Sequence, residues 1–217
     1  MQRGGFANGE YLGVSQPQPG PAGALSRIAV DLYWLPLGAG GRSVRLNGRI
    51  YEAVAARVQR RPTFDLYHSA LVVCVPDGRF VVEQAPVRDN GGPTRGVVVE
   101  GAVGCRRAGR FRIFRYEVRQ WRNGVIPDIG EAVDSPQHLT RDPLVARRIL
   151  DLVPTVPALV WGRDESQAGE MWNSNSLISW LITCSGLDVE SVHPPTGGRA
   201  PGWDAGIVVA RRREAMS

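Results

Sequence analysis

Residues 67–87 read YHSALVVCVPDGRFVVEQAPV, two Val-rich runs on either side of a Pro-Asp-Gly triplet at 76–78. Branched apolar side chains favour extended strands, whereas Pro and Gly supply the backbone angles that a tight turn requires. The stretch therefore predicts a β-hairpin with strands over 67–75 and 79–87.

The sequence on both sides of this hairpin predicts further strands and three helices. Asp142-Pro143 is typical of a helix start, and Gly186 of a helix end. We expect strands over 26–35, 96–103, 110–121 and 206–210, and helices over 48–60, from 143 to just before Pro154, and over 174–185. The fold class expected is α+β, an antiparallel sheet packed against a buried helix.

Length and composition predict one domain behind a tail. The chain has 217 residues, of which 43% are hydrophobic, enough to fill one sizeable core. Residues 1–25 are rich in Gly, Pro and Gln and cannot bury enough apolar surface to order themselves. We therefore expect a disordered tail over 1–25 and a single domain over 26–217.

Charge and cysteine content narrow the classes of partner. The net charge is +5, but every basic residue is Arg, which is weak evidence for nucleic acid, and we expect no nucleic-acid partner. Five arginines lie between 106 and 115, but Arg112 and Arg115 fall on opposite faces of the strand predicted there, so the five form no single patch. Three cysteines without a CxxC pair predict no metal site and no disulfide framework, and no membrane-spanning segment or leader is visible. We expect a cytoplasmic protein without a cofactor.

His68 is the histidine whose position indicates chemistry, because an imidazole inside an apolar strand loses solvation unless something pairs with it. The alternative is a core histidine bonded to a carbonyl. On the second hairpin strand, a two-residue turn places Glu83 on the face of His68, and a three-residue turn places Gln84 there. Either could orient the ring, with Glu83 preferred. Alternatively, Glu83 pairs with an arginine on a solvent face.

The helix predicted over 174–185 begins unusually, with Asn173-Ser174-Asn175-Ser176 before a largely apolar run. The helix is apolar around most of its circumference, which predicts that it is buried against the sheet. Asn and Ser are ordinary helix caps, but four in a row exceed what capping requires. A nucleophile in the first turn would have backbone amides and the positive end of the helix dipole beside it.

This order of elements resembles the circularly permuted papain-like fold of the NlpC-type superfamily, which includes the lecithin:retinol acyltransferase-like and PPPDE-like groups. In those groups the helix begins Asn-Cys-Asn-Ser or similar, and this chain has Ser in place of Cys. The resemblance spans residues 64 to about 185. It implies Ser174 as nucleophile, His68 as general base, and Glu83 or Gln84 as the orienting residue.

Two functions follow from the resemblance. The first is a hydrolase or acyltransferase acting on an amide, ester or thioester through an acyl-enzyme at Ser174. The second is a catalytically inactive papain-like module that binds a peptide or acyl ligand in the same cleft, because a serine hydroxyl holds its proton more tightly than a thiol. Substrate-lining residues are expected among Trp172, Asn173, Asn175 and Trp203.

Overall fold

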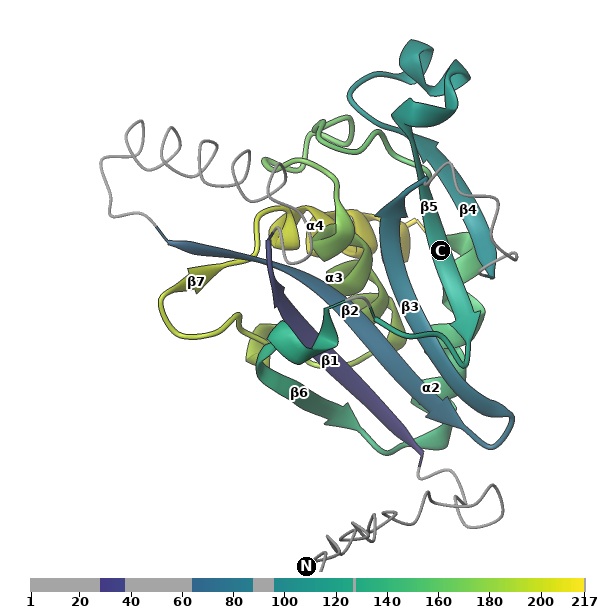
Figure 1. Cartoon of the computed structure of the whole chain (residues 1–217), viewed down its shortest axis with the longest axis vertical. Coiled ribbons are helices and arrows are strands. Elements are labelled where there is room, and N and C mark those ends of the chain that lie inside the picture. The colour runs from purple at the N-terminus through teal and green to yellow at the C-terminus, as the bar shows by residue number, and fades with distance from the viewer. Residues whose placement is uncertain (1–27, 38–63, 88–95, 127, 217) are drawn as a thin grey trace, which may run out of the picture.

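The hairpin predicted from the sequence lies in the middle of the sheet (Figure 1). The computed structural model describes residues 28–37, 64–87, 96–126 and 128–216. Strand β2 (Asp65–Val75) turns into β3 (Gly78–Pro86), and Val75 pairs with Gly78. The turn therefore consists of Pro76 and Asp77, and Gly78, expected in the turn, is the first residue of β3. Gly78 has a φ of +139°, which few other residues tolerate.

Six antiparallel strands form the main sheet, in the order β4-β5-β3-β2-β1-β6. A short strand β7 (Gly198–Arg199) pairs in parallel with the start of β2. The remaining strands are β1 (Ala29–Pro36), β4 (Val97–Ala102), β5 (Arg115–Arg122) and β6 (Val133–Thr140). The structure thus combines helices with an antiparallel main sheet, as the α+β class expected from the sequence requires.

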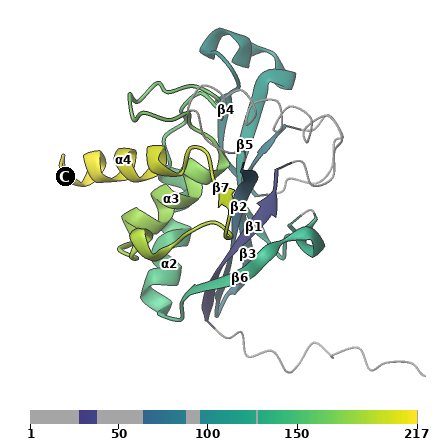
Figure 2. The same ribbon diagram turned by 90° about the vertical axis from the view of Figure 1, so that its left-hand side faces the viewer.

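Three helices cover one face of this sheet: α2 (Pro143–Leu152), α3 (Ser174–Ser185) and α4 (Trp203–Glu214) (Figure 2). Helix α2 begins as predicted, because the Asp142 side chain accepts a hydrogen bond from the amide of Leu144 at 2.8 Å. Helix α3 ends as predicted at Gly186, which has a φ of +85°.

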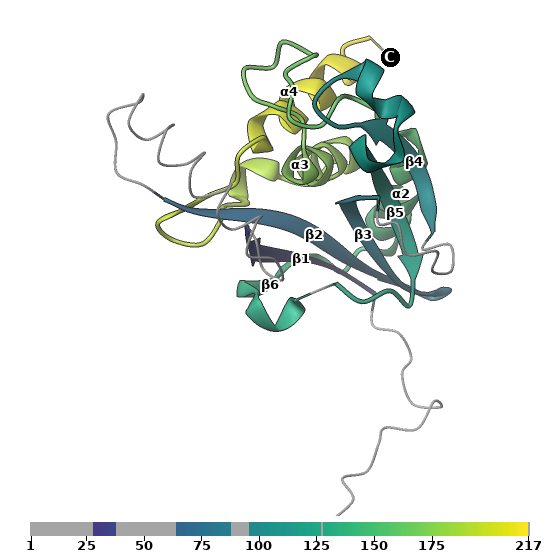
Figure 3. The same ribbon diagram turned by 45° about the horizontal axis from the view of Figure 1, so that its top comes forward.

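The two faces of the sheet carry separate apolar clusters. The helix side holds the main core, in which Leu32, Leu71 and Val82 of the sheet pack with residues of α2, α3 and α4. The opposite side holds a smaller cluster of Leu35, Ala70, Val72, Val81 and Ile126. Helix α3 lies over the centre of the sheet, seen nearly end-on in Figure 3, and is buried along almost its whole length. The predicted packing of this helix against the sheet is confirmed.

The prediction of a closing strand over 206–210 is wrong, because these residues belong to α4. The run Gly206 to Ala210 is β-rich in composition. However, Trp203, Ile207 and Ala210 are all buried, and their spacing of four and three residues is helical. Strand β6 was not predicted, since its sequence, VDSPQHLT, is polar and contains a proline. It lies at the edge of the sheet, where proline is tolerated.

The strand predicted over 110–121 begins later than expected, at Arg115. The residues before it form two 3-10 turns, Arg106–Arg110 and Arg112–Phe114. The tail predicted over 1–25 and the helix predicted over 48–60 lie outside the described residues.

Helices α3 and α4 approach closely at Gly206. A Cβ atom there would lie 2.1 Å from both the Ser176 carbonyl oxygen and the Ser179 Oγ. Gly206→Ala should therefore destabilise the protein by about 1–3 kcal/mol through overpacking, measured as a lower urea midpoint. Gly130→Ala is the matched control, since a Cβ at Gly130 meets nothing within 4 Å. Equal midpoints for the two variants would contradict the close approach.

Candidate functional site

The Asn-Ser-Asn-Ser start of α3 is first of all a complete helix cap. The Asn173 side chain accepts hydrogen bonds from the amides of Asn175 at 2.8 Å and Ser176 at 3.3 Å. In return, the Ser176 Oγ accepts from the Asn173 amide at 3.0 Å. Asn173 also donates to the Pro201 carbonyl at 2.8 Å. Asn173 and Ser176 therefore have structural roles that fix the helix start and attach it to the segment before α4.

Strand β2 contacts this helix start through Ser69. The Ser69 Oγ donates to the Asn175 Oδ1 at 2.9 Å, and both side chains are almost completely buried. The Asn175 Nδ2 donates to the carbonyls of Tyr67 and Pro201, each at 2.9 Å. Every hydrogen-bonding atom of the Asn175 amide group is thus engaged within the protein. A buried polar pair joins sheet and helix at the place where the sequence predicted an imidazole and a hydroxyl.

His68 points to the other face of the sheet. His68 pairs with Leu35 of β1, which belongs to the smaller apolar cluster. The next residue of β2, Ser69, faces α3. Successive strand residues alternate between faces, so His68 cannot reach the start of α3. The structure does not bring His68 and Ser174 together. Burial lowers the pKa of His68 to about 4, opposed by the negative charge of Asp128, and the ring is neutral near pH 7.

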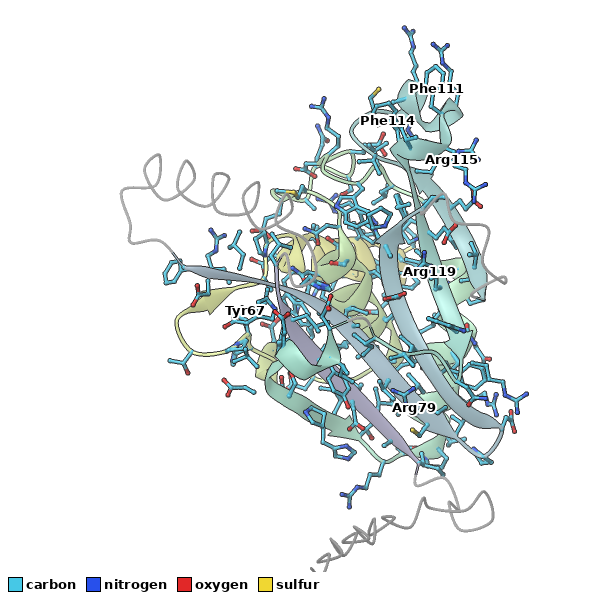
Figure 4. The ribbon with its side chains drawn as sticks, viewed as in Figure 1. Tyr67, Arg79, Phe111, Phe114, Arg115 and Arg119 are labelled. Carbon is cyan, nitrogen blue, oxygen red and sulfur yellow. The ribbon has the colours of Figure 1, made fainter. Side chains whose placement is uncertain are left out.

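Glu83 shares the sheet face of His68, but its partner is an arginine. Its Oε1 lies 3.0 Å from the Arg119 Nη1, and the other side of the same guanidinium lies 2.8 Å from Glu117. Arg119 is 3% exposed and occupies the middle of β5 (Figure 4). The alternative of a Glu83–arginine pair is therefore what the structure shows, although the pair is buried rather than on a solvent face.

Gln84 lies on the helix side of the sheet with Val82 and Val118, so unlike Glu83 it faces away from His68. It is 5% exposed, and neither atom of its amide group has a hydrogen-bond partner within the described ranges. Neither Glu83 nor Gln84 orients the imidazole in this structure.

The remaining predicted residues differ in their access to solvent. Ser174, the first residue of α3, is 6% exposed, and Trp172 is 2% exposed within the main core. Trp203 packs against Trp34 with ring centroids 5.1 Å apart, and it lines a groove of about 300 Å³ beside the start of α4. Of the four predicted substrate-lining residues, Trp203 is the one that the structure places on this cavity.

The groove beside Trp203, which we call the α4 groove, combines an apolar floor with a charged rim. Val192 and Ile207 contribute to the floor, and Glu170, Glu190, Asp204, His193 and Arg199 provide the charged or titratable groups. The Glu170 Oε2 accepts a hydrogen bond from the Gly202 amide at 2.7 Å. Burial is the main cause that raises the pKa of Glu170, and the negative charge of the nearby Asp204 raises it further. The hydrogen bond from Gly202 lowers it by less.

The sequence indicates part of the α4 groove. The stretch 199–206 combines an aromatic ring, a charge pair and glycines, which suits a lid or a cleft, and Arg199, Ala200, Trp203 and Asp204 line the groove. The other lining residues come from segments between 170 and 207 that have no motif in common, and no local pattern predicts that they meet. A larger cavity of about 400 Å³, lined by Glu100, Arg106 and Arg115 among others, lies at the other end of the sheet beside β4. None of the predicted site residues lines it.

Comparison of the chain with protein-family models, with curated proteins and with solved structures gave no match. Among the residues that the structure describes, no cluster of three or more His, Cys, Asp or Glu side chains is placed to hold a metal ion. No helix in the same part of the chain has the length and apolar character needed to cross a bilayer.

Proposed function

We propose that this chain is a non-catalytic binding module of papain-like type that holds a peptide ligand in the α4 groove. The observation that carries the proposal is the hydrogen bond from Ser69 to Asn175 at the contact between β2 and α3. An active papain-like site would use this strand-to-helix contact for a general base and a nucleophile. Here an amide and a hydroxyl occupy it, and neither titrates near neutral pH.

Within the part of the chain that the structure describes, the base predicted for Ser174 does not reach it. The Ser174 hydroxyl would need a base within hydrogen-bonding reach to remove the proton during attack. His68, the base expected from the sequence, belongs to the opposite face of the sheet. The backbone amides at the start of α3 are also occupied by the side chain of Asn173. These features favour the binding function over the hydrolase or acyltransferase.

The chemistry of the α4 groove favours a peptide over an acyl chain. An acyl chain needs a continuous apolar lining, whereas this groove carries three carboxylates beside one arginine and one histidine. A peptide with a basic side chain would place its apolar portion against Trp203 and its positive charge near Asp204. The carboxylates of Glu170 and Glu190 already face the guanidinium groups of Arg199 and Arg211, so Asp204 is the rim carboxylate that we assign to the ligand.

Covalent labelling with a fluorophosphonate probe tests the absence of catalysis. We expect the full chain to show no more labelling than its Ser174→Ala variant, while a known serine hydrolase in the same reaction is labelled. Labelling at Ser174 that disappears in His68→Ala would overturn the proposal, because it would require a working base and nucleophile.

Binding of a short peptide tests the groove. The probes are acetyl-Ala-Arg-Ala-amide and the analogue with citrulline in place of Arg. Binding of each is monitored through the NMR chemical shifts of the Trp203 indole. We expect shifts with the Arg peptide and about threefold weaker binding in Asp204→Asn, the size of an exposed ion pair. Asp151→Asn, an exposed substitution on α2, is the matched control. Equal binding of the two peptides, or no shift at Trp203, would contradict the assignment.

A further inference from the structure

A basic and apolar projection rises from the sheet where β4 leads into β5. It comprises residues 104–115, including the two 3-10 turns, and stands at the top of the molecule in Figure 1. The sequence predicted that Arg112 and Arg115 lie on opposite faces of a strand, so that the arginines of this segment form no single patch. Because the segment forms two 3-10 turns instead, its arginines need not alternate between two faces, and Phe111 and Phe114 both belong to this projection (Figure 4).

The tip exposes large apolar side chains. Phe111 is 52% exposed, Ile113 68% and Phe114 43%, three bulky residues within four consecutive positions. Other large exposed apolar residues in the described ranges, such as Leu144 and Met216, are far from this run in the sequence. Isolated exposed apolar residues need no explanation, but a contiguous group on a projecting element indicates an interaction surface.

Positive charge surrounds these apolar side chains. Arg107, Arg110 and Arg112 are exposed, and no carboxylate of the described residues forms an ion pair with any of them. The guanidinium of Arg110 lies over the Phe111 ring, 4.6 Å from its centroid. The projection contains no acidic residue. Its outer surface is therefore apolar and cationic at once.

The projection is held in place at its base. The Val103 amide donates to the Phe114 carbonyl at 2.8 Å, which closes the segment into a loop. Arg106 forms a two-point ion pair with Glu165, at 2.7 and 3.0 Å, and Arg115 donates to the Gly109 carbonyl at 2.5 Å. Arg106 and Arg115 thus hold the segment in place, and the exposed Arg107, Arg110 and Arg112 are available to a partner.

We infer that this projection docks on an anionic lipid surface. Phenylalanine and isoleucine side chains would enter the boundary between headgroups and acyl chains, while arginines remain among the phosphates. Unpaired guanidinium groups are complementary to phosphate and to the negative surface of an anionic leaflet. A nucleic acid fits less well, because Ile113, the most exposed apolar residue of the projection, has no ring to stack on a base.

Co-sedimentation of the full chain with vesicles tests this inference. We expect binding to vesicles of phosphatidylcholine mixed with phosphatidylserine, and much weaker binding to phosphatidylcholine alone. Added salt should reduce it. Arg110→Gln and Arg112→Gln should each weaken partitioning about fivefold. Combined Phe111→Ser, Ile113→Ser and Phe114→Ser should weaken it by about tenfold or more.

Matched controls come from α2, where Leu144 is 78% exposed and Arg148 is also exposed. Leu144→Ser and Arg148→Gln should leave vesicle binding unchanged, and circular dichroism of each variant checks that it is folded. Equal binding to neutral and anionic vesicles would overturn the inference, as would tip variants that bind like the wild type. Binding of oligouridylate without any vesicle binding would assign the projection to nucleic acid instead.

Discussion

Replacing Arg119 by Met should destabilise the fold by about 3–5 kcal/mol, the range observed when one partner of a buried ion pair is removed. The Arg119 side chain is almost completely buried between Glu83 and Glu117. Without its guanidinium, two carboxylates on neighbouring strands would face each other in a site with little water. Unfolding in urea at neutral pH measures the effect as a lower midpoint with an unchanged slope.

Arg147→Met is the matched control for this prediction. Arg147 pairs with Asp77, and both side chains are about half exposed, so its loss should change the free energy of unfolding by less than about 1 kcal/mol. Adding Glu83→Gln and Glu117→Gln to Arg119→Met should recover part of the lost stability, because it removes the unpaired charges. If Arg119→Met were no more destabilising than Arg147→Met, the buried ion pairs of Arg119 with Glu83 and Glu117 would not stabilise the fold more than an exposed pair does.

Acid should destabilise the protein through His68. The pKa of His68 is about 4 in the folded protein and 6.5 when unperturbed, because burial disfavours the charged ring. Between these values the unfolded chain binds a proton that the folded chain does not, so stability is full above pH 6.5 and falls as pH drops towards 4. Each unit of pKa difference corresponds to about 1.4 kcal/mol, giving a loss of up to about 3 kcal/mol.

The difference in unfolding free energy between wild type and His68→Leu, measured at several pH values, isolates this contribution. The pH-dependent loss should be smaller in His68→Leu, and also in His68→Asn, which keeps a polar group. Asp128→Asn should lower the pKa of His68 further, because the charge of Asp128 favours the protonated ring. An NMR titration showing the His68 ring protonating near pH 6.5 would contradict the burial argument.

Two features of the candidate site depended on contacts between distant segments. The turn length predicted that Glu83 shares a face with His68, but the partner of Glu83 is Arg119, which lies 36 residues further along the chain on β5. The order β5-β3-β2 places that guanidinium beside Glu83, and strand order is not encoded in either strand alone. The α4 groove likewise gathers residues from separate segments.

Elements whose signals are local could be predicted from the sequence. The hairpin turn, the Asp142 cap of α2 and the Gly186 end of α3 all depend on residues within a few positions of one another. Which residue of β2 faces α3 depends instead on contacts between distant segments. Adjacent strand residues point to opposite faces, so a shift of one position exchanges His68 for Ser69, and that position is set by packing against β1 and α3.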